Sequence, residues 1–336
     1  MQTETVPRTA ISAILASAMA AVALGLAGPP LAAQDAEPTG EPSPGEIVDQ
    51  AAPEEWRTID TDDMLVMELA PDMQGNPRRV IIQLMPDELT TQHGRNIRKL
   101  ARAHWWDGTA IVRVQDNYVV QWGDPAAEEE EAKPLPADLE EIPESEYVTE
   151  EAELAQGRAA LEEIRPLARI LQRDAYAPYT DFEDGWPLAS DLAGHFWPVH
   201  CYGMVGVGRG YSPDTGSGAE LYTVIGHAPR HLDRNIALAG RVIAGIEHLS
   251  SLPRGTGPLG FYETPEERTT ILSVRLASEL PEEERPAYAY LATTGPSFVR
   301  YAEARANRRD PFFIHPAGGV DICNIPVPIR DISEGE

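Results

Sequence analysis

Short apolar runs, each bounded by glycine, proline or other turn residues, constrain the fold of this chain more than any other feature. The 336 residues include 30 prolines and 27 glycines, which is too many for a helix bundle and suits a turn-rich β fold. Several runs have the length and the β-branched content of strands. These runs are Met64–Leu69, Arg79–Leu84, Thr109–Val114, Tyr118–Gln121, Gly203–Gly208, Glu220–Ile225, Ile236–Val242 and Thr269–Ala277.

Two helical stretches accompany these strands. Thr90–His104 places Ile97 and Leu100 on one face, and Ala244–Leu252 is a short helix that ends before a proline. The order of many short strands, with one helix near the start and one near the end, predicts a mainly β fold. We expect a closed antiparallel β-barrel capped by two helices.

The N-terminal residues have the pattern of a secretory signal. Arg8 precedes an uncharged, alanine-rich run from Ala10 to Ala27, and Gly28-Pro29-Pro30 then breaks any helix. The small residues Leu31–Ala33 suit a signal peptidase, so we expect residues 1–33 to be a signal peptide and the mature protein to be exported, to the periplasm. The alternative is an uncleaved membrane anchor, since 18 residues just span a bilayer.

The charge of the chain is strongly negative. Its 54 acidic residues against 27 Lys and Arg give a net charge of -27, which excludes nucleic acid and anionic lipid as natural partners. The acidic residues gather in a Pro-rich segment over 34–55, which predicts a disordered linker, and in residues 126–186. From Glu150 the latter show a helical period, with Leu154, Leu161, Ile164, Leu167, Ile170 and Leu171 on one face. We therefore predict a domain over 56–279, interrupted by an acidic helical insertion over 126–186, and a C-terminal extension over 280–336.

The chain has two cysteines, Cys201 and Cys323, which exclude a four-cysteine zinc site and an iron–sulfur cluster. In an oxidising compartment they can pair, and the long closed loop would then stabilise the fold by about 4–5 kcal/mol. The alternative is two buried free thiols.

Several local sequences, in a fixed order, point to one family. Trp106–Val114 reads Trp-Asp-Gly-Thr-Ala-Ile-Val-Arg-Val, and Tyr118–Pro125 reads Tyr-Val-Val-Gln-Trp-Gly-Asp-Pro. Gly203–Gly208, Glu220–Val224 and Leu232–Val242 follow downstream. Together these segments resemble the cyclophilin signature, and the chain is identified as a divergent bacterial, exported member of the cyclophilin-type peptidyl-prolyl cis/trans isomerases. The resemblance covers about residues 56–279 without the insertion.

The resemblance implies catalysis of prolyl isomerisation without a cofactor or metal. Rotation of an X-Pro amide has a barrier of about 20 kcal/mol and localises a lone pair on the prolyl nitrogen. A donor aimed at that nitrogen stabilises the twisted amide, and Arg113 takes the place of the family's catalytic arginine. The implied substrate-binding residues are Tyr118, Val119, Gln121, Gly208, Arg209, Glu220, Tyr222, His231 and Leu232.

Some of these positions depart from the family pattern. Val119 replaces a methionine of the pocket floor, Glu220 replaces a glutamine, and Arg209 replaces an asparagine. His231 stands where many members have tryptophan, and Ile236 where they have histidine. These changes keep open the alternative of a non-catalytic peptide-binding or assembly module. In either case the expected partners are proline-containing segments of client proteins.

Other motifs support weaker alternatives. Asp214-Thr215-Gly216 matches one half of an aspartic protease site, but such an enzyme needs two carboxylates. The glycines of residues 203–210 do not have the spacing of a dinucleotide fingerprint. Histidines are the remaining candidates for metal ligands, and Cys201 is a weak candidate for a thiol nucleophile. These histidines are His195, His200, His227 and His231.

Overall fold

A computed structural model of the chain provides the structure. It describes residues 40–89, 92–127, 129–150, 167, 170–171, 174–191 and 193–333. The predicted signal peptide over 1–33, and the predicted helical positions Leu154, Leu161 and Ile164, lie outside the described residues. In the part of the chain that is described, no helix has both the length and the apolar character that a membrane span needs.

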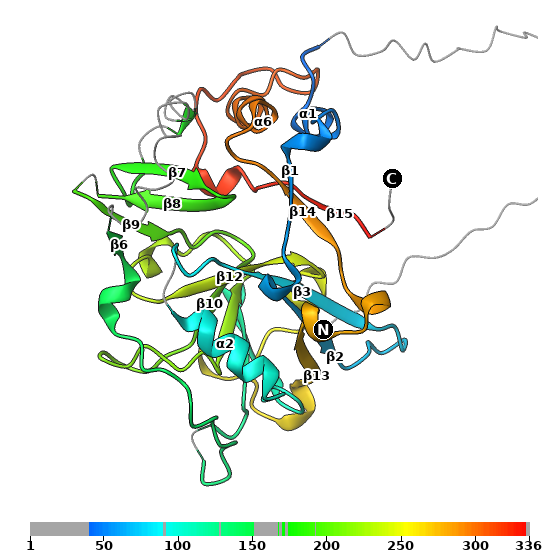
Figure 1. Ribbon diagram of the computed structural model, residues 1–336, viewed down its shortest axis with the longest axis vertical. Helices are drawn as coiled ribbons and strands as arrows, with labels where there is room; N and C mark the ends of the chain where they lie inside the picture. The colour runs from blue at the N-terminus through cyan, green and yellow to red at the C-terminus, as the bar shows by residue number, and fades with distance from the viewer. Residues whose placement is uncertain are drawn as a thin grey trace, which may run out of the picture. The chain divides into compact units, whose positions relative to one another are not determined.

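The central element is a closed antiparallel barrel of eight strands, as the sequence predicts (Figure 1). Neighbouring strands follow the order β10-β11-β5-β4-β13-β2-β3-β12 around the barrel. Their bounds are β2 Met64–Leu69, β3 Arg78–Leu84, β4 Ala110–Val114, β5 Val119–Gly123, β10 Met204–Val207, β11 Leu221–Val224, β12 Leu238–Ala244 and β13 Thr269–Leu276. Each lies within about two residues of a predicted run.

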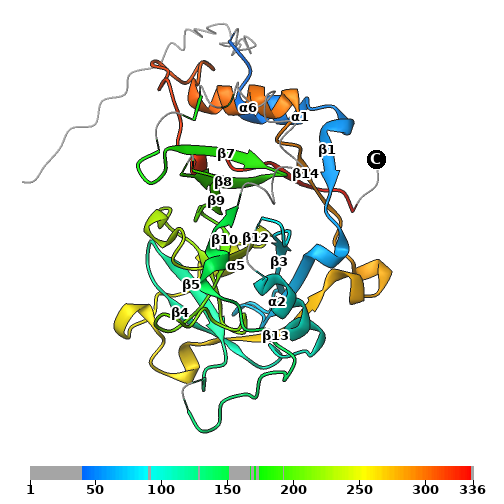
Figure 2. The ribbon, with the colours of Figure 1, turned by 60° about the vertical axis from the view of Figure 1, so that its left-hand side comes forward.

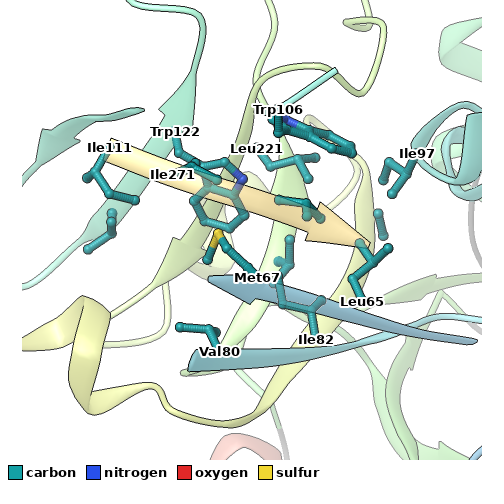
Figure 3. Close-up of a cluster of buried hydrophobic side chains, with 14 of the residues drawn as sticks. Leu65, Met67, Val80, Ile82, Ile97, Trp106, Ile111, Trp122, Leu221 and Ile271 are labelled. Carbon is teal, nitrogen blue, oxygen red and sulfur yellow. The ribbon is translucent and has the colours of Figure 1, made fainter. Parts of the chain in front are cut away.

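Alternating side chains of the strands fill the barrel interior. On β2, Leu65 and Met67 point inward and are at most 1% exposed, as the two-residue period of a strand requires. Trp106 and Trp122, each 1% exposed, are the largest fully buried side chains of this interior cluster, which Figure 3 shows together with Ile271. The barrel is therefore a packed core rather than a channel.

Two helices close the interior of the barrel. α2 (His93–Arg102) directs Ile97 and Leu100 into the cluster, and both are fully buried. α5 (Glu247–Ser250) contributes Leu249 in the same way. The predicted mainly β barrel capped by two helices is confirmed.

The insertion contains a sheet that its prediction does not include. Its described part forms a four-stranded antiparallel sheet in the order β6-β9-β8-β7, while Leu167 and Ile170, two positions of the predicted helical period, are helical. The strands are β6 Thr149–Glu150, β7 Tyr179–Glu183, β8 Trp186–Ser190 and β9 His195–Pro198. Since the last of these strands ends at Pro198, the sheet extends beyond the predicted limit at residue 186. Strands β7, β8 and β9 follow the run over 150–171 in which the sequence shows a helical period.

The prediction of a disordered linker over 34–55 was wrong for the second half of that segment. Residues 44–49 form helix α1 (Pro44–Asp49), whose start is fixed by a capping box between Ser43 and Glu46. Ile47 is 4% exposed because α1 packs against α6 (Pro296–Ala306), and both figures place the two helices side by side (Figures 1 and 2). The composition of this segment predicts disorder, but burial of Ile47 against α6, a helix far along the chain, orders it.

The C-terminal extension returns to the start of the chain. β1 (Trp56–Thr58), β14 (Tyr288–Leu291) and β15 (Ile329–Asp331) form a three-stranded sheet in the order β1-β14-β15. Phe298 of α6 then packs against Phe182 of the insertion sheet, and Tyr301 lies in the same buried cluster. Cys201 and Cys323 are joined in a disulfide, which ties the extension to the segment before β10.

Candidate functional site

Arg113 lies on β4 at the edge of the barrel and is held at all three guanidinium nitrogens. Nε donates to the Leu259 carbonyl at 2.7 Å, and Nη1 donates to Oε1 of Gln121 at 2.9 Å. Nη2 donates to the side-chain oxygen of Gln115. No carboxylate is among these partners, so the charge of Arg113 is oriented but not neutralised by an ion pair.

Two aromatic rings enclose the guanidinium of Arg113. Its central carbon lies 5.6 Å from the ring centroid of Tyr118 and 5.2 Å from that of Phe261, within the range of cation–π attraction. Burial lowers the pKa of Arg113 from its ordinary value, but a guanidinium stays charged at any physiological pH. A positively charged group of fixed orientation, flanked by two aromatic rings, therefore lies on β4.

A groove of about 770 Å³ opens beside Arg113. Five of the residues predicted from the sequence line it, and so do Phe261, Trp105 and Lys133. The five are Arg113, Gln121, Gly208, Arg209 and Glu220. A groove of this volume has room for several residues of an extended peptide.

The predicted residues Tyr118, Val119 and Tyr222 form an apolar cluster next to Arg113. Val119 and Tyr222 are 3% and 4% exposed, and Tyr118 and Ile236 pack against them. The ring of Tyr222 lies against Gly206, where a Cβ would come within 2.3 Å of the Tyr222 hydroxyl. The register pairs Tyr222 with Gln121 and Val224 with Val119, so the cluster and the groove share two neighbouring strands.

Gln121 connects Arg113 to Glu220. Its amide oxygen accepts from Arg113, and its amide nitrogen donates to Oε1 of Glu220. A Cβ at Gly208 would lie 2.8 Å from Glu220 Oε1, so a side chain there would displace the Glu220 carboxylate. The glutamate that departs from the family pattern therefore fits a network with Gln121, which fixes the amide orientation.

The remaining predicted residues lie at the rim. Arg209 donates through Nε and Nη2 to the Asn235 carbonyl at 3.0 and 2.8 Å, which turns its guanidinium along the groove wall. His231 stacks on Tyr118 with ring centroids 6.3 Å apart, and Leu232 follows it in the same 3₁₀ turn. The predicted residues thus lie on or next to β4, β5 and β11, directly after β10, and in the 3₁₀ turn Arg230–Leu232.

Comparison with known proteins identifies the family. Residues 71–276, more than half of the chain, match the family model described as cyclophilin type peptidyl-prolyl cis-trans isomerase/CLD. The chain belongs to the cyclophilin family. Its enzyme class is that of the peptidyl-prolyl cis-trans isomerases, and its substrates are proline-containing peptide segments.

Solved structures include related cyclophilins. The crystal structure of cyclophilin AquaCyp293 from Hirschia baltica is 25% identical, with a TM-score of 0.59, and the match covers 82% of this chain and 93% of that one. A cyclophilin type peptidyl-prolyl cis-trans isomerase of Cryptosporidium parvum is 10% identical with a TM-score of 0.34, over 64% of this chain and 96% of that one. No curated protein matches the sequence.

The sequence did not identify the loop that completes this cyclophilin's site. Leu259 and Phe261 lie in a loop after α5. Two backbone hydrogen bonds, from Gly255 N to the Val114 carbonyl and from Tyr262 N to the Val112 carbonyl, attach this loop to β4. In the sequence, Pro253 and Gly255 indicate only the end of a helix. The spacing of the glycines within Gly255–Gly260 is the one signal for a tight loop beside the arginine.

The competing motifs have structural roles in this cyclophilin. Asp214 accepts from the backbone N–H groups of Gly210 and Gly216 at 2.6 and 2.9 Å, which makes it a turn residue. Thr215 is buried and donates to the Ile142 carbonyl. Among the described residues, no group of three His, Cys, Asp or Glu could hold a metal ion. Cys201 is in the disulfide and is not a free nucleophile.

Proposed function

We propose that this cyclophilin is an active prolyl isomerase that uses Arg113 to stabilise the twisted X-Pro amide. The observation that carries the proposal is the fixed guanidinium of Arg113, which is held by three acceptors and two rings next to an apolar cluster. A proline ring has a complementary surface in Val119, Tyr118 and Tyr222. The preceding residues of the peptide would then run along the groove.

The proposed mechanism is differential binding of the transition state. In the planar amide the prolyl nitrogen shares its lone pair with the carbonyl and is a poor acceptor. As the bond twists, the lone pair localises, and a donor already in place gains an interaction without reorganising. Because the Arg113 guanidinium is held before substrate arrives, it needs little rearrangement to meet that nitrogen.

Gln121 and the rim residues would hold the peptide rather than act on the amide. The Gln121 amide is fixed between Arg113 and Glu220, so its oxygen faces the guanidinium and orients it. The backbone at Gly208 and Arg209 lines the groove and offers the polar groups that an extended peptide needs. These residues would raise affinity in the planar and twisted states alike.

The proposed setting is outside the cytoplasm, in the folding of exported proteins. The alanine-rich run from Ala10 to Ala27 supports export. The disulfide between Cys201 and Cys323 agrees with an oxidising compartment such as the periplasm. Mass spectrometry of the protein recovered from a periplasmic fraction tests this, since cleavage near Ala33 supports export and an intact N-terminus in the cytoplasmic fraction contradicts it.

The activity is tested by NMR exchange spectroscopy of a short X-Pro peptide with purified residues 34–336. The parent is expected to accelerate cis/trans exchange, and Arg113→Ala is expected to lose nearly all of this effect. Arg102→Ala is the matched control, since Arg102 is exposed at the end of α2 and pairs with Glu279, away from the groove. A folded parent without catalysis would favour the non-catalytic peptide-binding module instead.

A further inference from the structure

A chain of buried polar groups lies directly behind Tyr222. Its hydroxyl is 2.9 Å from Nε2 of His200, and Nδ1 of His200 is 2.9 Å from Oδ1 of Asp233. His200 is 1% exposed, so neither contact is a surface contact. Polar groups this deep in a protein are costly unless they are fully paired, which makes the arrangement informative.

The chain continues from Asp233 into the insertion. The other carboxylate oxygen of Asp233 accepts from Nε of Arg230 at 2.6 Å, and Nη1 of Arg230 donates to Oδ2 of Asp174 at 2.6 Å. The side chains of Arg230, Asp233 and Asp174 are only 3–4% exposed. Asp174 belongs to the insertion, so one buried network joins the insertion to a ring of the proposed site.

The charges in the network fix the direction of each hydrogen bond. Burial lowers the pKa of His200 from its ordinary value, although Asp233 acts in the opposite direction, so the imidazole is neutral at neutral pH. A neutral ring next to a carboxylate carries its proton on Nδ1 and donates it to Asp233. Nε2 is then an acceptor, and the Tyr222 hydroxyl, whose pKa burial raises well above its ordinary value, is the donor.

This direction determines which part of Tyr222 can face a substrate. The hydroxyl points inward to His200, while the ring lies against Gly206 and in the cluster with Val119. The surface available to a proline is therefore the apolar ring and not the hydroxyl. A phenylalanine at this position would fill the same space but would have no fixed partner behind it.

We propose that His200 is a positioning residue for the isomerase, holding the Tyr222 ring at the depth that a proline ring requires, with Asp233, Arg230 and Asp174 fixing His200 in turn. The inference rests on the proposed function. It gives the insertion a part in the site, because the insertion supplies the last carboxylate of the network. A peptide that presses on the ring must also change the hydrogen bond between Tyr222 and His200.

The direct test is NMR of the parent labelled with ¹⁵N in histidine and arginine, titrated with an X-Pro peptide. The Arg113 side-chain signal reports whether the peptide occupies the groove. The His200 ring signals are expected to shift with the same saturation curve, although His200 is buried and cannot touch the peptide. In Tyr222→Phe, the peptide is expected to shift the Arg113 signal but no longer the Nε2 signal of His200.

Kinetics supply the second readout. Tyr222→Phe and His200→Gln are expected to raise KM about threefold to tenfold, the range for loss of one buried hydrogen bond, with a smaller change in kcat. The matched control is the Asp191–His195 pair, whose side chains are 31% and 48% exposed. His195→Gln is expected to change neither parameter.

The outcomes separate this inference from the proposed function. His200 signals that stay fixed while the Arg113 signal saturates would overturn the positioning role and leave the isomerase intact. Unchanged kinetics in Tyr222→Phe, which keeps the ring and is expected to fold, would do the same. A parent that neither binds nor isomerises the peptide would reject the proposed function, and the positioning role with it.

Discussion

At the scale of single residues, the surroundings of Arg113 decide what it can do. A carboxylate partner would neutralise the charge of an arginine. Arg113 instead donates to one backbone carbonyl and two amide oxygens. Each of these acceptors is neutral, so the positive charge is available to a developing lone pair. Phe261, which is 39% exposed, covers the guanidinium from the groove side.

Phe261→Ala tests the importance of this ring. Removing a cation–π contact of this exposure is expected to lower kcat/KM about twofold to fivefold, because the guanidinium becomes less restricted. The control is Phe313→Ala, since Phe313 also covers an arginine, Arg308, at 4.2 Å but away from the groove. Equal rates for the parent and Phe261→Ala would show that the three hydrogen bonds suffice to fix Arg113.

A second residue-scale prediction concerns Asp181, a buried aspartate of β7. Burial raises its pKa to about 6, although Tyr179 and the Phe182 N–H donate to it. The folded state therefore binds this proton more tightly than the unfolded chain. The resulting stability is complete below about pH 4 and is lost as the pH rises through about 6, by about 3 kcal/mol at most.

Urea unfolding of Asp181→Asn at several pH values checks this. The asparagine cannot ionise, so the free energy of unfolding of the variant relative to the parent is expected to rise between pH 4 and pH 7. A flat difference for Asp181→Asn would contradict the raised pKa.

At the scale of elements, the loop after α5 is what brings a carbonyl to Arg113. Gly260 adopts a φ of +81°, and a Cβ there would lie 2.7 Å from the Gln115 backbone and 2.8 Å from the Val114 carbonyl. The loop can approach β4 only because position 260 has no side chain. The position of the Leu259 carbonyl follows from this close approach.

Gly260→Ala is therefore expected to weaken catalysis through the loop. The strained backbone costs about 1–2 kcal/mol of stability, and the displaced Leu259 carbonyl releases Arg113 Nε, which lowers kcat/KM further than Phe261→Ala does. Gly75→Ala is the matched control, because Gly75 has a φ of +86° but a Cβ added there would meet no atom within 4 Å. If both variants lose stability but neither loses activity, the loop does not position Arg113.

How far the elements could be predicted depends on where their partners lie in the sequence. β2 was predicted with its observed bounds, because its apolar run and the turn before β3 are local signals. α1 was missed because the surface that buries Ile47 belongs to α6, far along the chain. The same holds for the site: Arg113 and Gln121 lie within one motif, whereas Leu259 and His200 reach it through contacts over more than 20 residues.

At the scale of the whole chain, a few specific contacts hold the two additions to the barrel, the insertion sheet and the C-terminal extension. Arg241 of β12 donates to the Gly185 carbonyl at 2.7 Å and lies over the Trp186 ring, which joins the barrel to the insertion sheet. The disulfide joins the C-terminal extension to Cys201, the residue next to His200. The additions are thus fixed to the side of the barrel that carries the buried network.

Cys201→Ser with Cys323→Ser tests the contribution of the disulfide. The bond closes a loop between residues 122 positions apart, so its loss is expected to lower the free energy of unfolding by about 4–5 kcal/mol. Urea unfolding with and without a reductant measures this, and the reductant should affect the parent but not the double variant. Two titratable thiols in the unreduced, denatured parent would contradict the bond.

The central claim is that Arg113 acts on the transition state rather than on binding. One NMR titration of an X-Pro peptide with the parent and with Arg113→Ala gives both the Kd and the exchange rate of the bound peptide. The account predicts a Kd within a few-fold of the parent and an exchange rate lower by about a hundredfold or more, as for loss of one preorganised donor. A rate that stays near the parent's, or a loss explained entirely by weaker binding, would contradict it.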